Sequence, residues 1–141
     1  MNISKFLAII HMAMAALFIH GLAFCLDIPK TPLDVEGTDA EYRELLGLWK
    51  GYWDEKYDHV ILFYKISGGK AYITQSWSNA DRSVKRIWEI HQNDNLFVIS
   101  YTTLFGNYQL TCKKGYTKIF GLQFPQMTGV SCRSVVFNQV E

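Results

Sequence analysis

The sequence is poor in the residues from which catalytic and metal-binding motifs are built. Its 141 residues include only three cysteines and four histidines, and two of the histidines lie in an apolar stretch near the start. No Cys-x-x-Cys pair, His-Glu-x-x-His segment, Gly-x-Ser-x-Gly turn or glycine-rich phosphate loop occurs. The sequence therefore offers no support for a metal site, a cofactor or an activated nucleophile, and we expect none of the three.

The two remaining histidines leave a hydrolase as a minor alternative. His59 follows an aspartate, and Glu89 and His91 are two positions apart, so they share one face if they lie on a strand. The acidic residues between positions 54 and 58 fall in one expected hairpin, where hydration is the ordinary reason for carboxylates. Neither arrangement has the spacing of a known catalytic site. We expect a protein without enzymatic activity.

Charge is almost absent from the first 25 residues. Lys5 is the only charged residue there, and it precedes the apolar run FLAIIHMAMAALFIHGLAF, which ends just before Cys25. This pattern is typical of a secretory signal, so we assign residues 1–25 to a signal peptide and expect an exported protein, periplasmic or secreted. Two alternatives stay open. The run is nearly long enough for an uncleaved membrane anchor, and LAFC resembles a lipoprotein box, although Phe24 stands where a small residue is usual.

The exported part carries no net charge. All 13 acidic residues follow Cys25, and so do 13 of the 14 basic ones, because Lys5 alone precedes it. A nucleic-acid partner is therefore not expected. Contact with a membrane is expected only through the N-terminal segment or through a lipidated Cys25.

Removal or lipidation of Cys25 leaves Cys112 and Cys132, an even number that suits an oxidising compartment. Both fall in expected strands near the end of the chain. In a simple meander one strand would separate them, which usually exceeds the limit of roughly 7 Å between bridged Cα atoms. A disulfide between these two cysteines is therefore left open.

The segment before the first expected strand divides into two parts. Residues 26–37, which contain two prolines and a glycine, predict a linker or an extended arm. In TDAEYRELLG, which follows, Thr38 and Glu41 have the spacing of a capping box and Gly47 is a stop signal. We expect a short helix there.

From Leu48 onward the sequence consists of β-branched and aromatic runs separated by turn residues. SGGK, QNDN, FGN and KKG are short enough to join antiparallel neighbours. Eight strands joined in this way form an up-and-down meander, and closing it removes the exposed edges. The fold class predicted for residues 38–141 is therefore all-β, an eight-stranded antiparallel closed barrel, with an open sheet or a two-sheet sandwich as the alternative. The expected strands lie near 48–54, 57–66, 70–77, 84–92, 95–104, 107–113, 116–123 and 129–138.

The first of these strands, within LLGLWKGYW, places Trp49, Gly51 and Trp53 two apart. Such residues share one face of a strand. A glycine between two indoles makes room for a neighbouring side chain or a bend. Packing in the core is the plainest role for both tryptophans.

Gly47-Leu48-Trp49, entered from a short helix, resembles the Gly-x-Trp start of lipocalins and related calycin barrels. With the longer run through VILFYKISGGKAYITQSW, residues 46–77 are similar to small lipocalin-like domains of bacterial envelope proteins. The resemblance implies that Trp49 plugs one end of the barrel and that a basic residue of a late strand packs across it. Arg133 is the candidate for that basic residue, and the three residues of the Trp-x-Gly-x-Trp segment with Arg133 form the expected barrel-closing set.

Aromatic residues are abundant in the exported part, where they make up 18 of 116 residues. Because an eight-stranded barrel can hold one small ligand and aromatic rings line apolar sites well, we expect binding of a small apolar or amphipathic molecule. Tyr64, Trp77, Trp88 and Tyr101 are the expected lining residues. The alternative is a protein-interaction module, favoured by the strand HVILFYKI, which is apolar on both faces.

Overall fold

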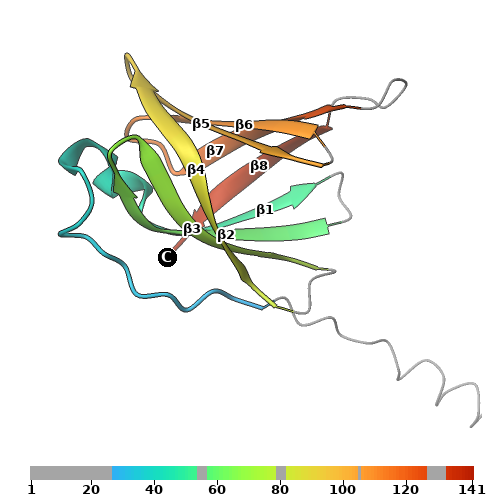
Figure 1. Ribbon diagram of the computed structural model, residues 1–141, viewed down its shortest axis with the longest axis horizontal. Helices are drawn as coiled ribbons and strands as arrows, with labels where there is room; N and C mark the ends of the chain where they lie inside the picture. The colour runs from blue at the N-terminus through green and yellow to red at the C-terminus, as the bar shows by residue number, and fades with distance from the viewer. Residues whose placement is uncertain (1–26, 54–56, 79–81, 105, 127–132) are drawn as a thin grey trace, which may run out of the picture.

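Eight antiparallel strands close into a barrel in which every strand pairs with its neighbours in chain order (Figure 1). The computed structural model describes residues 27–53, 57–78, 82–104, 106–126 and 133–141. A short 3-10 helix, η1 (Ala40–Leu45), precedes the barrel. The strands are β1 (Gly47–Trp53), β2 (Tyr57–Ser67), β3 (Lys70–Trp77), β4 (Val84–Asn93), β5 (Leu96–Thr103), β6 (Gly106–Lys113), β7 (Lys118–Pro125) and β8 (Arg133–Val140).

The predicted closed barrel is confirmed, and its strands lie close to the predicted ranges. Closure comes from β1, which pairs with β2 on one side and with β8 on the other. Gly51 faces Phe137 across the β1–β8 pair. A Cβ atom at Gly51 would lie 2.6 Å from Cδ1 of Phe137, so only glycine lets this ring enter the interior at the seam.

One end of the barrel, here called the closed end, is filled by apolar side chains and covered by η1. Trp49 is fully buried there, and its indole N–H donates a hydrogen bond of 2.9 Å to the carbonyl of Leu45, at the end of η1. Tyr42 of η1 packs against Phe97 with ring centroids 5.4 Å apart. The indole therefore ties the helix to the core as well as filling the end.

The capping box predicted at Thr38 and Glu41 is wrong. The helix is a 3-10 helix with Asp39 at its N-cap and no side-chain cap hydrogen bond. The hydroxyl of Thr38 instead donates to the carbonyl of Asp34 and accepts the backbone N–H of Ile66 on β2. A buried backbone N–H needs a hydrogen-bond acceptor. The Thr38 hydroxyl is the acceptor for the N–H of Ile66, so it is not available to cap the helix.

The described part of the predicted arm, residues 27–37, runs along the outside of β2 and β3 toward η1 (Figure 1). The backbone N–H of Asp34 donates to the carbonyl of Tyr64 at 2.7 Å, and the hydroxyls of Thr31 and Thr74 are 3.0 Å apart. The outward side chains Val60 and Leu62 are buried. The arm therefore covers the outward apolar face of the strand HVILFYKI. Because that face is already covered by the chain itself, the strand gives no support to a protein interface.

The part of the chain that the structure describes contains no helix that could span a lipid bilayer.

Replacing Trp49 with alanine should destabilise the protein by about 3–5 kcal/mol, because a large buried side chain leaves a cavity that the barrel cannot fill. The Leu45 carbonyl would also lose its hydrogen-bond donor. Urea unfolding measures the change, and Tyr116→Ala, at a side chain that is 55% exposed, is the control with little expected effect. A loss below about 1 kcal/mol for Trp49→Ala would contradict a plugging role, given that fully buried aromatics cost several times more.

Candidate binding site at the open end

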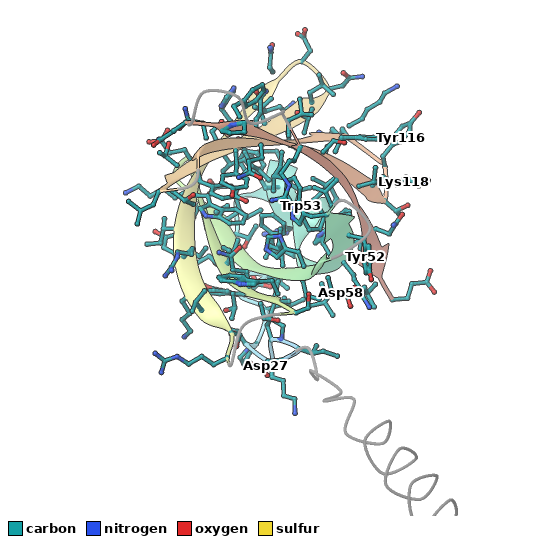
Figure 2. The ribbon with its side chains drawn as sticks, turned by 90° about the vertical axis from the view of Figure 1, so that its right-hand side faces the viewer. Asp27, Tyr52, Trp53, Asp58, Tyr116 and Lys118 are labelled. Atoms are coloured by element: carbon teal, nitrogen blue, oxygen red, sulfur yellow. The ribbon has the colours of Figure 1, made fainter. Side chains whose placement is uncertain are left out.

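The opposite end, here called the open end, carries the connections β1–β2, β3–β4, β5–β6 and β7–β8. Figure 2 views the molecule from this side and shows Trp53 within the ring of strands. The inward-facing side chains here differ from the apolar ones at the closed end, because they include His59, Gln75 and Gln123, all buried. Buried polar groups need partners, and His59 and Gln75 form hydrogen bonds with protein side chains here.

His59 is held by a hydrogen-bonded chain of three side chains. The indole N–H of Trp53 donates to Nδ1 of His59 at 3.1 Å, and Nε2 of His59 lies 2.9 Å from Oε1 of Gln75. An indole can only donate, so Nδ1 must accept and the proton of the neutral ring must sit on Nε2, which donates to Gln75. Both ring nitrogens are thus occupied by protein groups.

Burial lowers the pKa of His59 from 6.5 to about 4, while the hydrogen bond to Gln75 acts in the opposite direction. The ring is therefore neutral at neutral pH. Its edge contacts Phe137 and Trp77, with ring centroids 5.3 and 6.1 Å away. This arrangement holds the imidazole as a fixed, uncharged part of the wall.

Three aromatic rings form a row beside this chain. Trp88 and Tyr101 stack with centroids 3.9 Å apart and an interplanar angle of 5°, and Tyr101 stacks on Tyr108 at 4.6 Å and 4°. Trp53 then meets Tyr108 edge-on at 6.0 Å. Burial raises the pKa of Tyr101, which keeps its phenol protonated. The row joins β4, β5 and β6 to β1 across the interior.

The wall of the barrel opens between β4 and β5. The two strands pair only where Glu89–Asn93 lies opposite Leu96–Ser100, so residues 84–88 and 101–103 continue without pairing to each other. A pocket of about 380 Å³ occupies this break. It is lined by residues 86–89 of β4, residues 100–103 of β5 and Gln75 of β3. Trp88, which is only 4% exposed, and Tyr101 are the aromatic residues of this lining and form its apolar wall.

Arg86 is the basic residue of this lining. It lies opposite Ile73 in the β3–β4 pair, and because Ile73 faces the core, Arg86 is on the inward face of β4. One of its guanidinium nitrogens donates to the backbone carbonyl of Lys85 at 3.0 Å. Glu89 also lines the pocket but belongs to the outward face. The pocket thus combines an apolar wall with polar and charged groups at its rim.

Three of the four predicted lining residues lie at the open end. Trp88 and Tyr101 are stacked at the pocket, and Trp77 lies beside His59 with 37% of its surface exposed. Tyr64 is not with them. It lies on the outer surface, next to a β-bulge between Phe63 and Lys65, where its ring contacts Tyr72 at 6.5 Å.

The predicted packing of Arg133 across Trp49 is wrong, because the β1–β8 register places Gln139 opposite Trp49. Arg133 is six residues away at the start of β8, about 20 Å along the strand at roughly 3.3 Å per residue. It lies opposite Gln123 at the open end. At the closed end, the amide of Gln139 donates to the carbonyl of Leu46 at 3.4 Å, so an amide occupies the place expected for a guanidinium.

Cys112 is a free, buried thiol on β6. Burial raises its pKa to about 11, so it stays protonated. Cys132, its proposed disulfide partner, lies outside the described residues. Among the described residues, no group of three His, Cys, Asp or Glu side chains is placed to hold a metal ion, and His91 and Glu89 are both exposed.

The sequence reasoning missed Gln75 and Tyr108. Gln75 follows Ile73 at the inward spacing of two, and Tyr108 has the same spacing from Leu110. Extending the alternation from buried isoleucine and leucine would have placed both in the interior. No sequence signal indicates that the Gln75 amide binds His59.

Searches of protein-family models, of curated proteins and of solved structures each find no match to this chain. The site must therefore be interpreted from its own geometry.

We predict that acid destabilises the protein through His59. Above about pH 6.5 the ring is neutral in the folded and unfolded states, and the full stability is present. As the pH falls, the unfolded chain binds a proton first, so the free energy of unfolding decreases until the folded ring is protonated near pH 4. The expected loss is roughly 3 kcal/mol, at about 1.4 kcal/mol per pKa unit.

Urea unfolding between pH 7.5 and 4.5 tests this prediction. His59→Gln should remove the pH dependence in that window, whereas His91→Gln, at an exposed histidine, should keep it. Equal pH profiles for wild type and His59→Gln would refute the placement of a neutral His59 in the core.

Proposed function

We propose that this protein is an exported, non-enzymatic, lipocalin-like barrel that binds a small apolar or amphipathic molecule in the pocket between β4 and β5. The observation that carries the proposal is the break in pairing between these strands, because the pocket of about 380 Å³ at this break has two stacked aromatic residues, Trp88 and Tyr101, in its lining. That volume lies within the range of small-molecule sites, roughly 300–1,000 Å³.

The lining suits an amphipathic ligand. Its apolar part would lie against Trp88 and Tyr101, where burial of carbon surface contributes roughly 25 cal/mol per Å². Its polar end would reach Thr103 or Arg86 of the same pocket. The aromatic row behind the wall gives the pocket a rigid back, because each ring is fixed by the next.

The absence of enzymatic activity is part of the proposal. The best-placed titratable group at the open end is His59, and its two nitrogens are occupied by Trp53 and Gln75. A general base needs a free lone pair within reach of a substrate proton. The hydrogen bonds of His59 therefore favour a structural role over proton transfer.

A protein-interaction module is the second candidate, and one specific observation favours it. Phe120, Leu122 and Phe124 form an exposed apolar row on the outer face of β7, and Val136 of β8 extends it opposite Phe120. Exposed apolar groups in a continuous row mark an interface more often than scattered ones do. This row shares no residue with the β4–β5 pocket.

Titration with N-phenyl-1-naphthylamine, a neutral apolar fluorophore, tests ligand binding. We expect saturable binding near one-to-one stoichiometry, accompanied by a change in tryptophan emission because Trp88 lines the pocket. Tyr101→Leu should weaken binding about tenfold, the effect of losing roughly 1.4 kcal/mol of contact. Leu122→Ser, in the apolar row of β7, is the matched control and should leave the affinity unchanged.

Absence of saturable binding, or equal affinities for Tyr101→Leu and wild type, would rule out this pocket as the site. A loss confined to Leu122→Ser would move binding to the outer face of β7 and favour the interaction module.

A further inference from the structure

The arm formed by residues 27–37 begins at the open end of the barrel. At its start, the carboxylate of Asp27 accepts the backbone N–H of Ser83 at 2.7 Å, just before β4. The carbonyl of Asp27 also accepts the hydroxyl of Ser76 near the end of β3. Figure 2, which views the open end, shows Asp27 at its periphery. Asp27, the first described residue, is therefore at the open end, although η1, which the arm leads to, covers the closed end.

The apolar run stops only a few residues before that point. Phe24 ends it, and Cys25 and Leu26 alone separate it from Asp27. Three Cα–Cα steps span at most about 11 Å. If the run or an acyl chain on Cys25 is held in a bilayer, Asp27 must lie close to the membrane surface, and the open end is brought there with it.

The surface beside Asp27 is suited to anionic lipid headgroups. Arg82, Lys85 and Arg86 are exposed at or just before the start of β4, and Lys30 of the arm adds a fourth exposed cation. Arg86 is on the inward face, whereas Lys85 is on the outer face with its amine 5.9 Å from the centre of the Tyr64 ring. Asp27 keeps its negative charge, because the hydrogen bonds from Ser83 lower the pKa of its carboxyl group. Glu89, three residues beyond Arg86, is the acidic residue of the pocket lining, so four exposed cations accompany two carboxylates here. Basic residues close to an anionic leaflet are each attracted to it.

Apolar side chains accompany these charges. Ile87 is 60% exposed and Trp77 is 37% exposed, and tryptophan is enriched where proteins meet the interface of a bilayer. Charge alone would not choose this end, because Lys113, Lys114 and Lys118 form a comparable exposed cluster at the closed end. The open end differs from the closed end because Asp27, three residues after the apolar run, lies at the open end.

We infer that the open end of the barrel lies against an anionic membrane surface, with the pocket between β4 and β5 opening toward lipid. The inference rests on the tethered forms of the proposed exported protein, in which the apolar run or a lipidated Cys25 stays with the barrel. It also narrows the ligand to an amphiphile that reaches the pocket from the membrane.

The full chain, made by cell-free synthesis in the presence of phosphatidylcholine–phosphatidylglycerol vesicles, provides the test. In a background with Cys25→Ser and Cys132→Ser, an environment-sensitive fluorophore is attached at Ile87→Cys, an exposed position in the pocket lining, or at Tyr116→Cys, an exposed position in the β6–β7 turn at the closed end. Nitroxide-labelled lipids should quench the fluorophore at position 87 severalfold more than at position 116.

Two charge-reversal variants test whether the basic residues at the start of β4 hold the open end on the membrane. Arg82→Glu combined with Lys85→Glu and Arg86→Glu should reduce quenching at position 87 to the level at position 116. The matched variant Lys113→Glu with Lys114→Glu and Lys118→Glu should leave quenching at position 87 unchanged. With vesicles of phosphatidylcholine alone, quenching at position 87 of the unreversed protein should be as low as in the first variant. Equal quenching at both positions, or stronger quenching at 116, would overturn the inference.

Failure here is distinguishable from failure of ligand binding. Binding of N-phenyl-1-naphthylamine is measured without vesicles and without detergent micelles, so a protein that binds the fluorophore but shows no preferred orientation retains the pocket and loses only the membrane contact.

Discussion

The architecture of the open end depends on how β1 meets β8. The two strands pair only where Leu48–Gly51 lies opposite Phe137–Val140, and Phe137 can enter the interior because residue 51 has no side chain. Gly121 on β7 has a similar role, since a Cβ atom there would lie 2.6 Å from Cγ1 of Val135. Two glycines thus allow the β8 side chains to fill a narrow part of the barrel.

The β1–β8 and β4–β5 pairs are both short, and this divides the barrel into two halves, here called leaves: β1–β4 and β5–β8. Beyond Gly51 on one side and beyond Glu89 on the other, the facing strands continue unpaired, so β1–β4 and β5–β8 are joined mainly toward the closed end. Figure 1 shows β5–β8 above β1–β3, with β4 crossing between them. Aromatic stacking from Trp88 to Tyr108, and the edge contact of Tyr108 with Trp53, connect the leaves where backbone hydrogen bonds do not. A pocket at such a junction is a consequence of this division.

The strands and the closed barrel could be predicted because their signals are local. Period-two alternation and short turns with glycine or asparagine can be recognised from neighbouring residues alone. Arg133 was misplaced because its neighbour depends on the register of β8 against β1, which joins the two ends of the barrel. Tyr64 was misplaced because its strand is apolar on both faces and a bulge shifts the register beside it. Neither the arm that covers this strand nor the bulge can be recognised from the alternation of apolar and polar residues in the sequence.

The chain Trp53–His59–Gln75 could not be predicted for a related reason. Its members come from three strands, and each residue alone has a common structural role. Their hydrogen bonds depend on the orientation of side chains inside a closed barrel.

The most direct test of the central claim, that the β4–β5 break is a binding site, is an amide NMR titration with N-phenyl-1-naphthylamine. Shift changes should concentrate on Gln75, on residues 84–88 and 100–103, and on the indole N–H of Trp88, leaving the turn around Gly115 unchanged. Changes confined to the outer face of β7 and β8, or no saturable change at all, would contradict it.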